Sequence, residues 1–325
     1  MIEISCAFAT SLSTPDHVVA AERLGYHRAW LYDSPALYPD VWASLALAAT
    51  RTSRIGLGPG VLIPSLRHPM VNAAAIAQLE HLAPGRLAVA IGSGFTGRMT
   101  LGQRPLSWKF VRRYVAAVQS LLRGEQVEWD GALMQMMHPE GFAPRRPISV
   151  PTILGVAGPK GAAVAADLAD GMFISGMPPV PVEAGRMCVQ LTFGTVLDDD
   201  EDPGSARALA AAGHGAAVSL HAMYERGADF SRIPGGAKWV AEIETIPANE
   251  RHLAVHDRHL IALTERDARL VNGEMLRRFG LARTRSEWRE HLERLESAGI
   301  TEIAYQPAGP DIPGELARFA EAAGI

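Results

Sequence analysis

The chain has 325 residues, of which 48% are hydrophobic and 20% are charged, and its formal net charge is −4. This composition is typical of a globular protein with a large core, and it excludes the strongly basic surface by which proteins bind nucleic acids or anionic membranes. No apolar run is long enough to span a bilayer, the N-terminus lacks the basic region of a signal peptide, and the two cysteines have no disulfide or zinc spacing. We therefore expect a reduced, cytoplasmic protein that binds a small molecule.

Strand and helix patterns alternate along the chain. Helix-start signals stand between short apolar runs: Asp40 precedes one helical pattern, Ser107 precedes an amphipathic one, and Thr284 with Glu287 forms a capping box. The apolar runs predict strands at residues 2–8, 29–32, 55–58, 87–91, 152–156, 171–175, 187–196 and 303–305.

Eight apolar strands separated by helices predict an α/β fold, with a parallel sheet covered on both faces. Because eight is the strand number of a closed barrel, we expect a single (β/α)8 TIM-barrel domain over residues 1–325. Residues 123–148, which contain a hairpin pattern, and residues 223–283 interrupt the rhythm. We expect both insertions over the C-terminal face, where they would shape a substrate pocket.

A doubly wound sheet is the alternative fold, since residues 92–97 match the GxGxxG pattern of dinucleotide-binding proteins. Residues 98–102, however, provide no helix start with an apolar face, and no acidic residue near position 115 could bind a ribose. These two observations favour the barrel.

Glycines stand at the ends of two neighbouring predicted strands. One strand runs into Gly58-Pro59-Gly60-Val61, and the next ends in Gly92-Ser93-Gly94. Because glycine has no Cβ, the backbone can approach a ligand closely there. The pattern suggests one flat ligand held across both strand ends.

These segments, together with Arg67-His68-Pro69 and Gly85-Arg86, resemble the bacterial-luciferase-like monooxygenase superfamily. Within it they are most similar to methylenetetrahydromethanopterin reductases, which use the deazaflavin coenzyme F420. Residues 150–159 resemble that family's phosphate loop after the fifth strand, and residues 169–171 and 299–302 resemble the starts of later strands. The resemblance is poor over residues 223–283. It implies hydride transfer between reduced deazaflavin and an organic substrate, and we expect a homodimer.

The resemblance also implies a set of site residues. Asp33 and Ser34 are the candidate catalytic residues; the family has His where this chain has Ser34, so the resemblance supplies no proton donor. A non-prolyl cis peptide between Gly60 and Val61 would form a bulge behind the deazaflavin ring. Backbone N–H groups at a helix start would bind the phosphate. The implied cofactor-binding residues are Asp33, Gly60, Val61, Gly92, Ser93, Gly94, Gly155, Ala157, Gly158, Pro159, Lys160 and Ser175.

Two other functions stay open: an FMN-dependent luciferase-like monooxygenase, and a non-catalytic flavin- or deazaflavin-binding protein. Phe95 stands where some deazaflavin sugar dehydrogenases carry Glu, which argues against that branch. His252, His256 and His259 have the spacing of one helical face, but no carboxylate accompanies them as in HExxH motifs. We therefore expect no metal site.

Overall fold

A computed structural model describes residues 2–325 of the chain. Its main sheet has eight parallel strands in the order β3-β2-β1-β12-β9-β8-β7-β4. The sheet closes on itself, because Leu57 and Leu62 pair with Leu87 and Ile91 between its two edges. The predicted (β/α)8 barrel is thereby confirmed. The barrel strands are β1 (Glu3–Phe8), β2 (Arg28–Leu31), β3 (Gly56–Pro59), β4 (Val89–Gly92), β7 (Thr152–Gly155), β8 (Gly171–Ile174), β9 (Met187–Phe193) and β12 (Glu302–Gln306).

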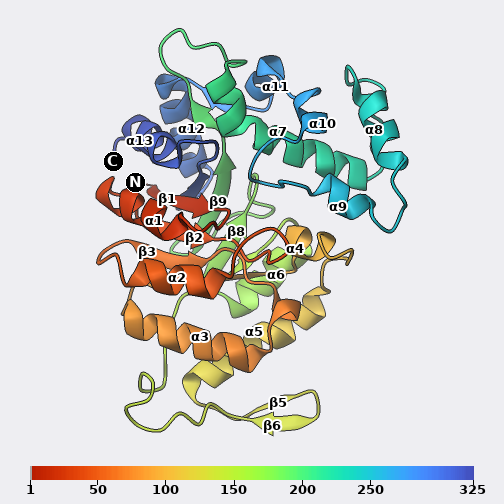
Figure 1. Cartoon of the computed structure of the whole chain (residues 1–325). Helices are drawn as coiled ribbons and strands as arrows, with labels where there is room; N and C mark the ends of the chain where they lie inside the picture. Colours follow the sequence, from red (N-terminus) through yellow and green to blue (C-terminus); the bar gives the residue numbers. More distant parts are fainter. Residues whose placement is uncertain (1) are drawn as a thin grey trace.

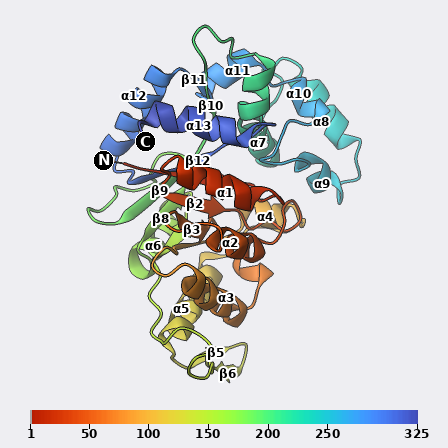
Figure 2. The ribbon, with the colours of Figure 1, turned by 60° about the vertical axis from the view of Figure 1, so that its left-hand side comes forward.

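A ring of helices surrounds the barrel, each packed against the next (Figures 1 and 2). The predicted start signals are present as hydrogen bonds. The Asp40 side chain accepts from Ala43 N, the Ser107 side chain accepts from Phe110 N, and Thr284 forms a capping box with Glu287. The ring consists of α12 (Arg285–Ser297), α13 (Ile312–Ala323), α1 (Thr14–Arg23), α2 (Val41–Ala49), α3 (Pro69–Leu82), α5 (Trp108–Arg123) and α6 (Pro159–Leu168).

Alanines and a few large side chains, among them Trp30 and Phe173, fill the barrel interior. Trp30 is fully buried, donates from Nε1 to Glu302 Oε1 at 2.7 Å, and meets Phe173 edge-on. A Cβ at Gly58 or Gly60 would lie 2.7 Å or 3.1 Å from Trp30. These two glycines of β3 and its exit therefore make room for the indole, which packs against Phe173, a residue that lines the site described below.

The first insertion lies on the outside of the barrel. Strands β5 (Val127–Trp129) and β6 (Ala132–Met134) form the predicted antiparallel hairpin. Trp129 packs edge-on against Phe110 and Tyr114 of α5, so the hairpin covers the helix layer and appears at the lower end of Figure 1. The expectation that this insertion covers the C-terminal face is wrong, because apolar burial against α5 holds it elsewhere.

A helical unit lies beside the barrel (Figures 1 and 2), and it begins at Ala206, earlier in the chain than the insertion predicted at residues 223–283. It has an apolar cluster of its own, centred on Leu220, Trp239 and Leu276, which is separate from the barrel core. The unit contains α7 (Ala206–Glu225), α8 (Gly236–Glu244), α9 (Arg251–Val255), α10 (Glu265–Ala268) and α11 (Gly273–Arg278), and the remaining elements are η1 (Pro64–Leu66), α4 (Phe95–Met99), β10 (Thr195–Val196) and β11 (Ala282–Arg283).

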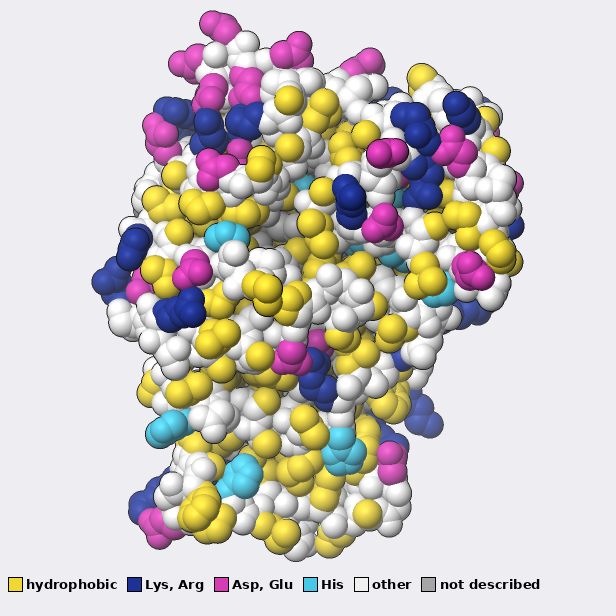
Figure 3. Space-filling model, in the orientation of Figure 1, with side chains coloured by type: hydrophobic (Ala, Val, Ile, Leu, Met, Phe, Trp, Pro, Cys, Tyr) yellow, Lys and Arg dark blue, Asp and Glu magenta, His cyan; other side chains and the backbone are white. Residues whose placement is uncertain are grey.

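Acidic side chains gather at the upper edge of the face shown in Figure 3, over the loop between β10 and α7. The run of acids at residues 198–202 lies in this loop, just before α7. Glu201 and Asp198 pair with Arg207 and Arg318, so part of this charge is neutralised within the protein. Over residues 2–325, each helix is too short or too polar to cross a bilayer.

Candidate functional site

A cavity of about 660 Å³ opens where the carboxyl ends of the barrel strands meet the helical unit. Because parallel barrel strands all end on one face, residues far apart in the sequence come together there. Every predicted site residue lines this cavity: Asp33, Ser34, Gly60, Val61, Gly92, Ser93, Gly94, Gly155, Ala157, Gly158, Pro159, Lys160 and Ser175. Their binding and catalytic roles stay predictions.

Val61 explains two of the glycines. The Gly60–Val61 peptide is cis, as predicted. A Cβ at Gly92 would lie 2.7 Å from Val61 Cγ2, and one at Gly155 would lie 3.0 Å from Val61 Cγ1. Packing within the protein therefore accounts for the lack of a side chain at these two strand ends, while their roles in cofactor binding stay predictions. Gly92 and Gly155 make room for the Val61 side chain, which bulges across β4 and β7 as part of the cavity wall.

Gly158 behaves differently from those glycines. It is the N-cap of α6, and a Cβ added there would meet no atom within 4 Å, so its open side faces the cavity. The start of a ten-residue helix carries partial positive charge and free N–H groups, which suit an anion. Trp108, which the sequence reasoning missed, packs against Gly161 of the same turn and also lines the cavity.

Asp33 is bound within the protein rather than free. Arg67 Nη1 donates to both of its oxygens at 2.8 and 2.7 Å, and Ile63 N donates at 3.3 Å. Burial raises the pKa of the Asp33 carboxyl, and the hydrogen bonds and charge of Arg67 offset part of that rise. Arg67 Nη2 also binds Asp40 Oδ2 at 2.7 Å. Asp33 thus fixes the corner between β2, α2 and the β3 exit, and Ser34 follows it at the cavity wall.

The far wall of the cavity comes from the helical unit, part of which is the insertion expected to shape the pocket, but its individual residues were not predicted. Its residues are Val218, Ala222 and Arg226 around α7, and His259 and Leu260 in the loop after α9. Buried bonds hold that loop over the barrel: Tyr38 OH donates to His259 O, and Gln306 Nε2 donates to Leu260 O, both at 2.6 Å. These contacts join residues 221 and 46 positions apart, and no local pattern signals them.

The predicted histidine stripe is wrong. Helix α9 ends at Val255, so His256 and His259 leave the helical spacing, and His252 lies against Gly102 instead. The buried cluster that forms contains His221 of α7 together with His256 and His259.

Comparison with known proteins gives concordant matches. The sequence model of the luciferase-like monooxygenase family matches residues 13–302. A 5,10-methylenetetrahydromethanopterin reductase of Archaeoglobus fulgidus is 27% identical over 311 residues, which cover 91% of this chain and 90% of the reductase. An F420-dependent glucose-6-phosphate dehydrogenase of Beutenbergia cavernae is 29% identical over 234 residues, or 65% of each chain. The structure of the coenzyme F420-dependent tetrahydromethanopterin reductase of Methanopyrus kandleri shares the fold, with a TM-score of 0.68 at 19% identity over 99% of this chain and 98% of that one.

Proposed function

The chain belongs to the luciferase-like monooxygenase family, and from that membership we propose that it is an F420-dependent oxidoreductase. The proposed reaction is hydride transfer between the reduced deazaflavin and a small organic substrate. Two relatives support this proposal: a methylenetetrahydromethanopterin reductase that matches 91% of this chain, and an F420-dependent glucose-6-phosphate dehydrogenase that matches 65% of it. They support this branch of the family, while the substrate of this chain is left to experiment.

The shape of the cavity is the observation that carries the proposal. A deazaflavin has a flat ring at one end and a phosphate-bearing tail at the other. The apolar wall at Val61 and Phe173 suits the ring, and the open Gly158 at the start of α6 suits the tail. In this proposed arrangement, a Cβ at Gly158 would occupy the space that the phosphate-bearing tail requires. The residues present therefore fit the cofactor.

The cofactor supplies a carbon centre that gives or takes a hydride and does not activate oxygen. The protein then contributes placement, charge and a dry site. Arg67 and Asp33 hold the strand ends rigid through their buried ion pair. We propose that the Ser34 hydroxyl, beside Asp33 at the cavity wall, donates a hydrogen bond to the substrate. Arg226, on the opposite wall, would attract a polar or anionic substrate group.

A cofactor titration tests this proposal. Trp108 lines the cavity, so quenching of its fluorescence should report occupancy. We expect F420 to bind in the low micromolar range or below and to turn over anaerobically with an electron acceptor. The matched control is Trp108→Phe, which should lose most of the quenching and retain binding by calorimetry. Absence of F420 binding by both methods would contradict the proposal.

The two alternatives predict different results. An FMN-dependent monooxygenase should bind FMN at least as tightly as F420 and oxidise its substrate only with oxygen. A non-catalytic carrier should bind cofactor and show no turnover with any acceptor. The family name itself, which records monooxygenases, is the reason to include the FMN arm.

A further inference from the structure

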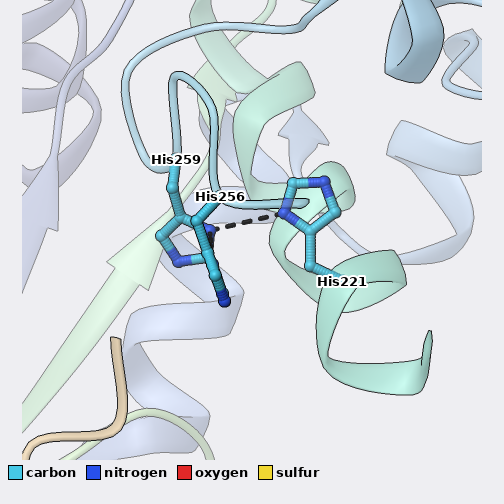
Figure 4. A group of neighbouring side chains, drawn as sticks. All are labelled: His221, His256 and His259. Carbon is cyan, nitrogen blue, oxygen red and sulfur yellow. Dashed lines mark hydrogen bonds between the residues drawn. The ribbon is translucent and has the colours of Figure 1, made fainter. Parts of the chain in front are cut away.

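Three buried imidazoles meet between α7 and the loop after α9. The Nδ1 atom of His259 lies 3.3 Å from Nδ1 of His221 and 3.2 Å from Nδ1 of His256, as Figure 4 shows in part. Each of the three residues is at most 3% exposed. His221 reaches the meeting point from α7, while His256 and His259 reach it from one short turn.

The outer ring nitrogens contact polar partners. His256 Nε2 lies 2.7 Å from Glu225 Oε1, His221 Nε2 lies 3.3 Å from Asp267 Oδ2, and His259 Nε2 lies 3.4 Å from Thr96 Oγ1. Asp267 is itself held by Trp239 Nε1 at 2.9 Å and Thr264 Oγ1 at 2.7 Å. A carboxylate beside Nε2 favours a proton on that nitrogen, which leaves a lone pair on Nδ1. His221 and His256 therefore both direct lone pairs toward His259.

Hydrogen bonds among the three imidazoles cannot satisfy all three Nδ1 atoms. His259 Nδ1 can carry one proton, and that proton can be donated in line to only one of the two facing lone pairs. The reverse arrangement needs two buried imidazolium ions that both donate to the single lone pair of His259. A cation at the meeting point, in contrast, accepts all three lone pairs at once.

We propose that Nδ1 of His221, His256 and His259 form a binding site for a divalent transition metal of the Zn²⁺ type. Zn–N bonds of about 2.0–2.1 Å in a tetrahedral site place the ligand nitrogens about 3.3 Å apart. Two of the three pairs here are 3.2 and 3.3 Å apart, and the ligand nitrogens of the three residues all lie within 4.8 Å of one another. Imidazole is a ligand that Zn²⁺, Ni²⁺ and Cu²⁺ accept. His259 also lines the cavity, which gives the metal an access route.

The expectation of no metal site rested on the lack of an accompanying carboxylate. The structure supplies two, Glu225 at the end of α7 and Asp267 in α10, each against the outer nitrogen of a ligand. Such carboxylate–histidine–metal arrangements orient ligands and raise their basicity. Neither carboxylate has a helical spacing to the histidine that it contacts, so no local pattern indicates these pairs.

Metal binding to the full chain tests the proposal. After stripping with a chelator, the protein should bind one Zn²⁺ per chain by calorimetry, with a Kd below about 1 μM. Loading the stripped protein with one Co²⁺ per chain should produce the visible absorption bands of a Co²⁺ ion with nitrogen ligands. His259→Leu should abolish stoichiometric binding, and Glu225→Gln should weaken it about 10- to 100-fold. His252→Ala is the matched control, because His252 lies on α9 outside the cluster, and its Zn²⁺ affinity should be unchanged.

X-ray absorption of the Zn²⁺-loaded wild-type protein covers the case in which a variant fails to fold. Three imidazole ligands at about 2.0–2.1 Å are expected. Fewer than three imidazoles, no stoichiometric binding by the wild-type chain, or an undiminished Zn²⁺ affinity in folded His259→Leu would each overturn the proposal. F420 affinity measured on the same samples keeps this result separate from the proposed function.

Discussion

Gly158 is the position at which one substitution should separate cofactor binding from folding. Its φ of −166° and ψ of 172° are extended values that valine adopts readily, and an added Cβ meets no atom within 4 Å. Gly158→Val should therefore place three carbons in the cavity without a collision inside the protein. Valine is a poorer N-cap than glycine, so we expect a loss of about 1 kcal/mol, or about 1–2 °C in Tm for a chain of this size.

The effect on F420 should be much larger than the effect on stability. If the phosphate lies at the start of α6, valine displaces it and removes at least one hydrogen bond to a charged group, which is worth about 1.5–3 kcal/mol. That loss corresponds to a rise in Kd of about 10- to 150-fold. Fluorescence titration of the wild type, Gly158→Ala and Gly158→Val should give a graded series, with Tm measured on each apo protein. A Kd for Gly158→Val within about twofold of the wild-type value would refute the placement of the tail.

Three further outcomes follow from the described contacts. Arg67→Met should lower the free energy of unfolding in urea by about 3–5 kcal/mol, because the Asp33 carboxylate stays buried without its partner; the double variant with Asp33→Asn should recover much of this loss, and additive losses would argue against the pair. F420 should bind more tightly than FMN or NADPH in parallel titrations, and equal FMN affinity with oxygen-dependent turnover would favour the monooxygenase. Burial opposes ionisation of Glu201, but hydrogen bonds from Arg207 and Ser205 hold its pKa at about 2, below the ordinary 4.5. The ionised Glu201 therefore contributes fully to the free energy of unfolding above about pH 4.5, and this contribution is lost as pH falls toward 2. Glu201→Gln should reduce the change in unfolding free energy between these pH values by roughly 1–2 kcal/mol. Parallel plots of unfolding free energy against pH for the two proteins would contradict the lowered pKa of Glu201.

The barrel could be predicted because each of its parts carries a local signal. A buried parallel strand is a short apolar run, and a helix start is marked by one side chain such as Asp40, Ser107 or Thr284. Once the strands are known, topology places their carboxyl ends on one face. The strand-end residues of the site therefore follow from the sequence, although the reason for Gly92 and Gly155, namely the volume of Val61, required coordinates.

The individual residues of the wall formed by the helical unit could not be predicted, because tertiary contacts place them. A helical period grouped His252 with His256 and His259, but the chain leaves the helix after Val255. It then turns through Arg258 and Leu260 at φ of 53° and 62°, values that are unusual for such side chains. The bonds that hold this turn come from Tyr38 and Gln306, at opposite ends of the sequence.

The two walls of the cavity are built from different parts of the chain, and this bears on specificity. The proposed cofactor wall consists of barrel strand ends, whereas the other wall belongs largely to a helical unit with its own apolar cluster. Ala222, on α7 at the cavity, belongs to none of the apolar clusters of the barrel, so it can change without disturbing the barrel core. A substitution there should alter the KM for the substrate while the Kd for F420 stays constant. In the proposed arrangement only the wall formed by the barrel strand ends contacts the cofactor. A large change in F420 affinity on Ala222→Leu, in a protein with wild-type Tm, would show that the cofactor also lies against α7.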